Sequence, residues 1–469
     1  MNGDSQTSKP ANYDESVRAL LALGRELASP QQARVQKFGL ENIRVLAEEL
    51  GEPHRAAPCV HITGTNGKGS TAAMLESILR AAGMRTGLYT SPHLERINER
   101  IRINGQDISD SDFAAAWTRV RDSIERLMAA GKLKVHPTFF ECVTAMAFVA
   151  FAEAKLDFVV DEVGLGGRLD ATNIVHPEAC VITQIDFDHE NFLGHSIAEI
   201  AAEKAGIIKP GVPVVSSVER PEARDVIARR CSDLKSRLVE IDRAWRLEDV
   251  RAADGCYSAT ATATDGSRKL VLEPALPGRF QLRNALAAAT AARLLSERGF
   301  PITDKAIERG IASVNWPGRL ERVCTRPALY LDGAHNPAAA RELLKFWEEN
   351  FAGRRIVLVY GAMRDKAVDE IAGLLFPRAD RILLTQPRQP RAISAPLLAE
   401  LTSHHGVSWE AIPDPAAALD RAIESAGLED AIFVTGSLFL VGDLRKYWRV
   451  RQSEQAAAGA QAGSARQFR

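Results

Sequence analysis

The sequence lacks an excess of charge of either sign, since its 469 residues include 59 basic and 60 acidic ones. Surfaces that bind nucleic acid or anionic membranes carry a basic excess, so we expect neither partner. The sequence also lacks a run of about eighteen apolar residues, which argues against a membrane-spanning helix. Residues 1–14 have no apolar core typical of a signal peptide. We therefore expect a cytoplasmic protein.

Paired cysteines are also missing. No two of the six cysteines form a CxxC motif, and most of them follow or lie within apolar runs. This pattern predicts buried, reduced thiols rather than disulfides or a zinc site. The hydrophobic fraction of 46% and the charged fraction of 25% are typical of a soluble globular protein. The six cysteines are Cys59, Cys142, Cys180, Cys231, Cys256 and Cys324.

Apolar runs that resemble strands alternate with helical patterns along most of the chain, which predicts an α/β fold with parallel sheets. A helix is expected over residues 70–82, because Met74, Leu75, Ile78 and Leu79 share one face. Residues 258–272, with a turn at Asp265, are expected to form an antiparallel hairpin at a sheet edge. The expected strands of this half are residues 58–63, 156–160, 180–185 and 212–216.

A second α/β unit of domain size follows residues 316–319. Its expected strands are residues 329–331, 356–360, 381–385 and 432–435, and its helices begin near Asn336, Lys366, Ala395 and Pro415. We therefore divide the chain into a polar segment (1–14), a large N-terminal domain (15–315), a smaller doubly wound domain (316–450) and a disordered tail (451–469).

Residues 61–70 carry the most informative motif of the chain. Three glycines, Gly64, Gly67 and Gly69, lie between the first strand and the first helix, and Lys68 lies among them. Glycines allow a backbone to approach an anion, and a helix N-terminus with a lysine attracts phosphate. Only two residues separate the first two glycines, where the usual P-loop has four. The motif predicts a polyphosphate site; a flexible loop with a chance lysine would not explain the strand, loop and helix order.

Acidic residues follow the strand at residues 156–160. Asp161 or Glu162 would place a carboxylate beside the phosphate loop, which is how nucleotide enzymes hold Mg²⁺. The strand alone does not distinguish the two residues. The glycines at 164–167 could instead belong to a dinucleotide fingerprint, but the final glycine spacing is missing.

His189 follows the next expected strand, at the carboxyl end where open α/β sheets bind ligands. Its place favours a ligand role over that of an ordinary loop histidine. Ser196 and Glu199 form a capping box, and the helix that they begin puts Lys204 on its buried face. A buried ammonium is unfavourable unless it is paired or modified. Spacing leaves open a salt bridge or a lysine carbamate that would bind a second Mg²⁺.

Further polar residues lie on loops and helix starts. Ser91 offers a hydroxyl as a magnesium ligand, or is simply a turn residue. Thr138, Phe139 and Phe140 begin a helix, where the two rings either pack in the core or form a wall for a flat aromatic ligand.

The second unit has its own polar set. Asp332 and His335 lie at the end of one expected strand, and Ser437 follows the last strand. Asn284 and Arg319 complete a set of residues far apart in sequence. Each of these residues alone would be explained by a structural role, but together they predict a cleft between the domains.

These motifs resemble the folylpolyglutamate synthase and dihydrofolate synthase family, a branch of the Mur ligases. The matching segments follow the family order over nearly the whole chain: residues 64–70, 91–100, 138–141, 162–173, 188–211, 277–284, 316–321, 332–337 and 435–442. His195 and Ser196 stand where the family commonly has threonine, and the tail after Val450 has no counterpart.

The resemblance implies a three-layer ATPase domain, a smaller C-terminal domain and a monomer that adds L-glutamate to a folate, to dihydropteroate or to both. It implies that Lys68, Lys204 and His189 are catalytic. Its implied ATP ligands are Gly64, Thr65, Asn66, Gly67, Lys68, Gly69, Ser70, Asn284, Arg319 and Asp332. Its implied ligands of two Mg²⁺ ions are Ser91, Glu162, His189 and carbamylated Lys204, and its substrate residues are Thr138, Phe139, Phe140, His335 and Ser437.

Two other functions remain possible from the sequence. A peptidoglycan-type ligase would take a UDP-muramyl acceptor, but no separate UDP-binding domain precedes the phosphate loop. A nucleotide-dependent binding module without ligase chemistry would not need two acidic strand ends and a buried lysine.

Overall fold

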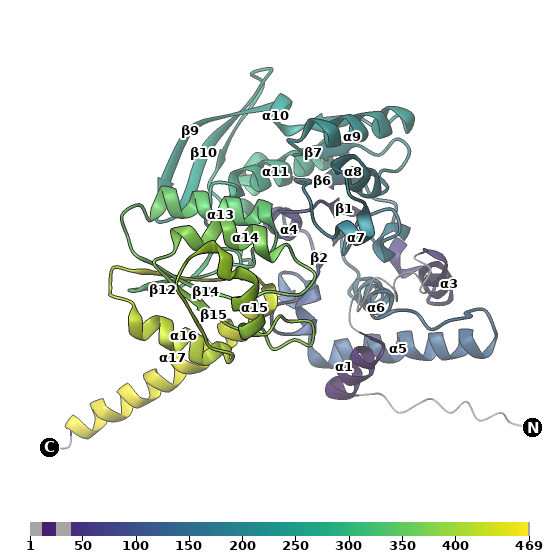
Figure 1. The fold of residues 1–469 in the computed structure, drawn as a ribbon. Helices are drawn as coiled ribbons and strands as arrows, with labels where there is room; N and C mark the ends of the chain where they lie inside the picture. Colours follow the sequence, from purple (N-terminus) through teal and green to yellow (C-terminus); the bar gives the residue numbers. More distant parts are fainter. Residues whose placement is uncertain (1–11, 25–38, 468–469) are drawn as a thin grey trace, which may run out of the picture. The chain divides into compact units, whose positions relative to one another are not determined.

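The computed structural model describes residues 12–24 and 39–467, so most of the expected polar segment (1–14) lies outside the described residues. The chain divides into two compact units (Figure 1). The first contains Met1–Ala275 and Arg279–Asn315, and the second contains Leu276–Gly278 and Trp316–Arg469.

An eight-stranded sheet organises the first unit, in the order β4-β3-β2-β5-β1-β6-β7-β8. The strands from β2 to β8 in this order are parallel to one another, while β3 and β4 are antiparallel additions. The central strands are buried along their full length, which is why they appear in the sequence as continuous apolar runs. The bounds are β1 Cys59–Thr63, β2 Thr86–Tyr89, β3 Ile101–Ile103, β4 Gln106–Asp107, β5 Phe158–Glu162, β6 Ala179–Ile182, β7 Val214–Ser216 and β8 Leu238–Glu240.

Helices cover both faces of this sheet. On one face, side chains of α5 and α6 pack with Cys59 of β1 and Val159 of β5, and α8 and α9 pack with β6 and β7. Helices α4 and α11 pack against each other and against strands of the sheet, and α12 packs against these two helices. The bounds are α1 Tyr13–Ala22, α3 Glu41–Glu49, α4 Lys68–Ala81, α5 Asp110–Ala129, α6 Phe139–Glu153, α7 Glu190–Leu193, α8 Ile197–Ala205, α9 Pro221–Asp233, α10 Ile241–Ala244, α11 Gln281–Glu297 and α12 Asp304–Ala312.

The expected hairpin is confirmed, since β10 (Cys256–Ala263) pairs antiparallel with β11 (Lys269–Leu272). It does not lie at the edge of the large sheet. It belongs to a separate three-stranded sheet with β9 (Trp245–Ala253), and the order is β11-β10-β9.

The second unit has a six-stranded sheet in the order β12-β13-β17-β14-β15-β16. All pairs are parallel except that of β12 with β13. The fold class expected from the sequence, two α/β units with parallel sheets, is confirmed. The strands are β12 Glu321–Thr325, β13 Ala328–Leu331, β14 Ile356–Tyr360, β15 Arg381–Leu384, β16 Trp409–Ala411 and β17 Ala431–Thr435, and the helices are α13 Pro337–Asn350, α14 Val368–Leu375, α15 Ala395–Thr402, α16 Pro415–Ser425 and α17 Leu438–Gln467.

Helix α17 differs from the expected disordered tail, because its backbone stays helical to Gln467. The tail has little apolar surface to bury, but it is rich in alanine, the residue with the highest helix propensity. Across the described parts of the chain, no helix is both long enough and apolar enough to cross a membrane.

Candidate active site

The loop between β1 and α4 is held tightly by the neighbouring strand β6 and helix α11. Thr65 and Asn66 donate backbone hydrogen bonds to the Gln184 carbonyl, at 2.7 and 3.3 Å. A Cβ at Gly64 would overlap the Thr183 hydroxyl. Gly67, with φ at 87°, ends the loop as the residue before α4. Glycine alone tolerates a positive φ and neighbours that leave no room for a Cβ atom, so these positions hold the loop in one shape.

Asn284 of α11 lies directly against this loop. A Cβ at Gly67 would overlap the Asn284 Oδ1 atom, and the Asn284 amide donates to Gln281 Oε1 at 2.8 Å. The N–H groups in the first turn of α4 have no intrahelical acceptor and point toward the loop. The loop and Asn284 therefore surround a helix N-terminus that can accept an anion.

Lys68 folds back over the phosphate loop. Its ammonium donates to the carbonyl oxygens of Gly64 and Thr65, at 3.0 and 3.1 Å. The charge thus lies directly over the glycine turn, where a polyphosphate would bind.

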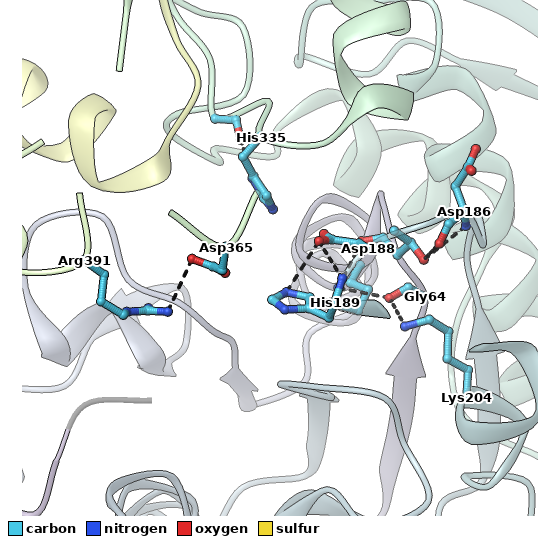
Figure 2. A network of polar contacts seen from close by, with 11 residues as sticks. Gly64, Asp186, Asp188, His189, Lys204, His335, Asp365 and Arg391 are labelled. Carbon is cyan, nitrogen blue, oxygen red and sulfur yellow. Dashed lines mark hydrogen bonds and ion pairs between the residues drawn. The ribbon is translucent and has the colours of Figure 1, made fainter. Parts of the chain in front are cut away.

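Lys204 is the most perturbed cation of the unit. Its side chain leaves α8, is only 4% exposed, and donates to the Gly64 carbonyl at 2.8 Å (Figure 2). Burial lowers the pKa of Lys204 to about 7, and the positive charge of Lys68 acts in the same direction. The carboxylates of Asp188 and Asp170 raise this pKa in part. Burial of Lys204 is confirmed, and the acceptor of its hydrogen bond is a backbone carbonyl rather than the carboxylate that a salt bridge would require.

Glu162 and Ser91 meet at the carboxyl end of the sheet. Glu162 is the last residue of β5 and is 4% exposed. Its Oε2 atom accepts a hydrogen bond from the Ser91 backbone N–H at 3.2 Å. Strand β5 lies between β1 and β2, so this carboxylate and the Ser91 hydroxyl share an edge with the phosphate loop. They are hard oxygen ligands of the kind that Mg²⁺ prefers.

Asp161 points to the opposite face of β5 from Glu162. Burial raises the pKa of Asp161 to about 7, although the Cys59 side chain forms a hydrogen bond with it. A carboxyl that holds its proton near neutral pH is a poor metal ligand. The geometry therefore favours Glu162.

The loop after β6 lies against the phosphate loop. The Thr65 hydroxyl donates to the Asp186 carbonyl at 2.9 Å and accepts from the Asp186 N–H at 3.1 Å. His189 follows with φ at 53°, and its Nε2 atom is 3.8 Å from Asp188 Oδ1 (Figure 2). The expected ligand His189 is thus placed on the same rim as Lys204.

Two residues that the sequence did not single out hold this site together. Asp170 accepts a hydrogen bond from the Leu165 N–H at 2.9 Å, and the Thr63 hydroxyl donates to the Gly166 carbonyl at 2.6 Å. Both bonds fix the glycine-rich segment after Glu162. For Thr63, the signal available in the sequence was a polar residue at the end of a mostly apolar strand.

The glycines at 164–167 are explained by packing rather than by a dinucleotide. A Cβ at Gly164 would overlap the Phe140 ring, and one at Gly167 would lie 2.9 Å from the Glu203 carbonyl oxygen.

Thr138, Phe139 and Phe140 begin α6, as expected. Thr138 caps the helix by accepting the Glu141 N–H. Phe139 is 5% exposed, with the Arg100 guanidinium 5.3 Å from its ring centroid. Phe140 is half-buried, and its ring centroid is 6.2 Å from that of Tyr89. Phe139 therefore packs in the core, and Phe140 has the more accessible ring.

The second unit gathers its polar set at the ends of β13 and β17, which are neighbours. Asp332 accepts the N–H groups of Leu320 and Ala334, each at 2.9 Å. Burial raises the pKa of Asp332, and the Arg319 guanidinium opposes this shift. A Cβ at Gly333 would lie 2.5 Å from the Arg319 Nη1 atom, so Arg319 and Asp332 belong to one cluster.

His335 and Ser437 lie beside this cluster. The His335 ring is fixed by its Nδ1 atom, 2.7 Å from the Gly333 carbonyl. The Ser437 hydroxyl accepts the Phe439 N–H at 3.2 Å, at the start of α17. The Gly436 N–H donates to the Ala334 carbonyl at 3.0 Å, which joins the two loops.

The first unit thus brings together the loop residues 64–70 with Ser91, Glu162, His189, Lys204 and Asn284. The second unit brings together Arg319, Asp332, His335 and Ser437. The set in the first unit can place a polyphosphate and divalent cations beside two lysines.

Family models match both units. The Mur ligase middle domain matches residues 62–292, and the Mur ligase glutamate ligase domain matches residues 318–438. The chain is 38% identical over 415 residues to the dihydrofolate synthase/folylpolyglutamate synthase of Bacillus subtilis, which covers 87% of this chain and 95% of that protein. It is 34% identical over 423 residues to the Escherichia coli protein of the same name, with 89% and 92% covered.

Solved structures agree with this relationship. Mycobacterium tuberculosis folylpolyglutamate synthase, complexed with ADP and AMPPCP, matches with a TM-score of 0.82 and 31% identity, over 92% of this chain and 99% of that one. The E. coli FolC structure with DHPP and ADP matches with a TM-score of 0.81 and 31% identity, over 95% and 99%. The chain belongs to the folylpolyglutamate synthase/dihydrofolate synthase family of the Mur ligases.

Proposed function

We propose that this protein is an ATP-dependent ligase that joins the amino group of L-glutamate to a carboxylate of a folate, with dihydropteroate as a second acceptor. The observation that carries the proposal is the convergence of Lys68 and Lys204 on the Gly64 carbonyl of a preformed phosphate loop. The names of the B. subtilis and E. coli relatives, and the ADP and DHPP bound to E. coli FolC, support the choice of substrates.

The reaction follows from the chemistry of a carboxylate. A carboxylate does not acylate an amine at neutral pH, because its oxygen is a poor leaving group. Transfer of the γ-phosphoryl group of ATP to the carboxylate gives an acyl phosphate and ADP. The glutamate amine then attacks the carbonyl carbon, loses a proton, and releases inorganic phosphate from the tetrahedral intermediate.

The protein's own groups would position the reactants and balance charge. The loop N–H groups and Lys68 would hold the phosphates and stabilise the charge that develops during transfer. The ammonium of Lys68 lies beside this site, where it donates to the carbonyls of Gly64 and Thr65. We assign Asn284, Arg319 and Asp332 to the nucleotide.

The residues present fit magnesium. Ser91, Glu162 and His189 would hold one Mg²⁺, and a carbamate on Lys204 would supply oxygen ligands for a second. Lys204 fits this modification because its pKa of about 7 provides the neutral amine that adds to CO₂. Bound Mg²⁺ would neutralise charge on the phosphate oxygens.

We assign the remaining expected residues to the binding of the other two substrates. We assign His335 and Ser437 to L-glutamate, and Thr138, Phe139 and Phe140 to the pterin-containing acceptor. Phe140 is the stronger candidate for ring contact, because Phe139 is 5% exposed. We expect a monomer in the cytoplasm, which size-exclusion chromatography and fractionation of cells would check.

An acceptor panel tests the function. Purified protein with ATP and Mg²⁺ is given dihydropteroate, tetrahydrofolate or a UDP-muramyl peptide, each with and without L-glutamate. Phosphate release and the amide product are measured by mass spectrometry. Glutamate-dependent product with a pteridine acceptor is expected. Product only with the UDP-muramyl acceptor would favour a peptidoglycan ligase, and nucleotide binding without any amide product would favour a binding module.

The carbamate has its own test. Lys204→Ala is expected to lose turnover, and a short carboxylate such as formate should restore part of it by replacing the carbamate oxygens. A wild-type protein with unmodified lysine under bicarbonate, together with no rescue of the variant, would remove the carbamate from the mechanism.

A further inference from the structure

Two consecutive histidines in the second unit converge on one carboxylate. His404 and His405 lie on the 3₁₀ turn Ser403–His405, which follows α15. The Nε2 atom of each ring is 2.9 Å from the same oxygen, Asp369 Oδ1, in the first turn of α14. The ring centroids are 4.2 Å apart. The side chains of consecutive residues commonly point in different directions, so the approach of both histidine rings to one carboxylate is a specific arrangement.

We propose that Asp369, His404 and His405 form a binding site for a divalent transition metal such as Zn²⁺, separate from the ligase site. Metal–ligand bonds of about 2.0–2.2 Å place neighbouring ligand atoms about 2.9–3.4 Å apart at angles near 90–110°. The two nitrogen–oxygen distances of 2.9 Å match this spacing. The ligand atoms of all three side chains lie within 4.8 Å of one another, so one ion can contact all three.

The more buried half of the site is held in place. The His405 side chain is 17% exposed, and its ring packs edge-on to that of Phe376, with centroids 6.5 Å apart. A Cβ at Gly373 would lie 3.2 Å from His405 Cε1, so the glycine lets the ring approach α14. His404, 59% exposed, and Asp369, 70% exposed, then close the site from the solvent side.

The donor set selects the kind of metal. Two imidazole nitrogens and one carboxylate suit Zn²⁺, Ni²⁺, Co²⁺ or Cu²⁺, whereas Mg²⁺ and Ca²⁺ prefer ligand sets made mostly of oxygen atoms. The magnesium that serves the proposed ligase would therefore not compete. Three protein ligands leave positions for water, and the exposure of the site keeps these open to solvent.

The ion would tie two segments that are not adjacent in sequence. Asp369 begins α14, and His404 and His405 precede the edge strand β16. A bound metal would cross-link the start of this helix to the turn before the edge strand. Binding to the folded form alone would raise its thermal stability.

The test uses the full-length chain after removal of metals with a chelator. Zn²⁺ is titrated by calorimetry in excess Mg²⁺ and a non-thiol reductant. One binding event is expected in the wild type, lost in the double variant H404Q/H405Q and weakened in Asp369→Asn. The matched control is His176→Gln, an exposed histidine outside the cluster, which should titrate like the wild type.

Two further measurements distinguish Zn²⁺ binding at this site from binding elsewhere in the chain. The event should persist in Glu162→Gln, whereas its loss there would assign it to the proposed magnesium site and overturn the proposal. The absorption spectrum of the protein with Co²⁺ bound should show bands typical of nitrogen and oxygen ligands. Thiolate charge-transfer bands would instead assign the metal to cysteines and overturn the proposal, as would an unchanged titration in H404Q/H405Q. The double variant should keep its ligase activity in Mg²⁺.

Discussion

Replacing Lys204 by methionine should remove a pH dependence from the stability of the first unit. The pKa of this lysine falls from an ordinary 10.5 to about 7 in the fold, because the side chain is buried next to Lys68. Between these pH values the unfolded chain binds the proton and the folded chain has released it. Stability therefore rises with pH across this window.

The magnitude follows from the two pKa values. At pH 7 the lysine is fully charged in the unfolded chain and half charged in the folded one. The lowered pKa then reduces the free energy of unfolding by about 4 kcal/mol. At pH 9 the cost falls to about 2 kcal/mol. Wild-type protein should therefore gain about 2 kcal/mol between pH 7 and pH 9 relative to Lys204→Met, which carries no such group.

Urea unfolding in buffers free of CO₂ measures this difference, so that the carbamate does not form. The control is Lys305→Met, an exposed lysine of α12, which should follow the wild type at both pH values. Equal pH dependence in wild type and Lys204→Met would refute the reasoning, because it would show that Lys204 keeps its proton in the folded protein.

Three other substitutions test the first unit. Lys68→Ala should lower kcat at least about a hundredfold with little change in melting temperature, since the side chain is half-buried at the start of α4 and lies outside the apolar core; a retained kcat would exclude its role in phosphoryl transfer. Gly64→Ala should weaken ADP binding in calorimetry and cost about 1–3 kcal/mol of stability, because its Cβ would overlap Thr183; normal ADP affinity would contradict the close fit of this loop. Phe158→Ala should cost about 3–5 kcal/mol in urea unfolding, because the ring is fully buried against Phe300; a much smaller loss would mean that the core collapses into the cavity.

The sequence predicts the strands that are buried on both faces. β1, β5, β14 and β17 are runs of five residues, and they were recognised because packing between two helical layers requires continuous apolar side chains. β9 was missed because most of its side chains are exposed and four of its nine residues are charged, so neither alternation nor an apolar run marks it. Its pairing with β10 fixes it instead.

The sequence likewise predicts some features of the candidate site and not others. The phosphate loop and the burial of Lys204 were predictable because glycine spacing and helical periodicity are local properties. The atom that Lys204 contacts was not, since Gly64 is 140 residues away in sequence. The supporting bonds of Thr63 and Asp170 also join distant segments, and only the register of the sheet brings them together.

The two lysines that share the Gly64 carbonyl imply an order of events. Burial lowers the pKa of Lys204, and the positive charge of Lys68 lowers it further. A triphosphate that neutralises Lys68 would relieve this repulsion and favour the charged form of Lys204 again. Addition of dissolved CO₂ to Lys204, as proposed above, should therefore be most favourable before nucleotide binds, with ATP binding second.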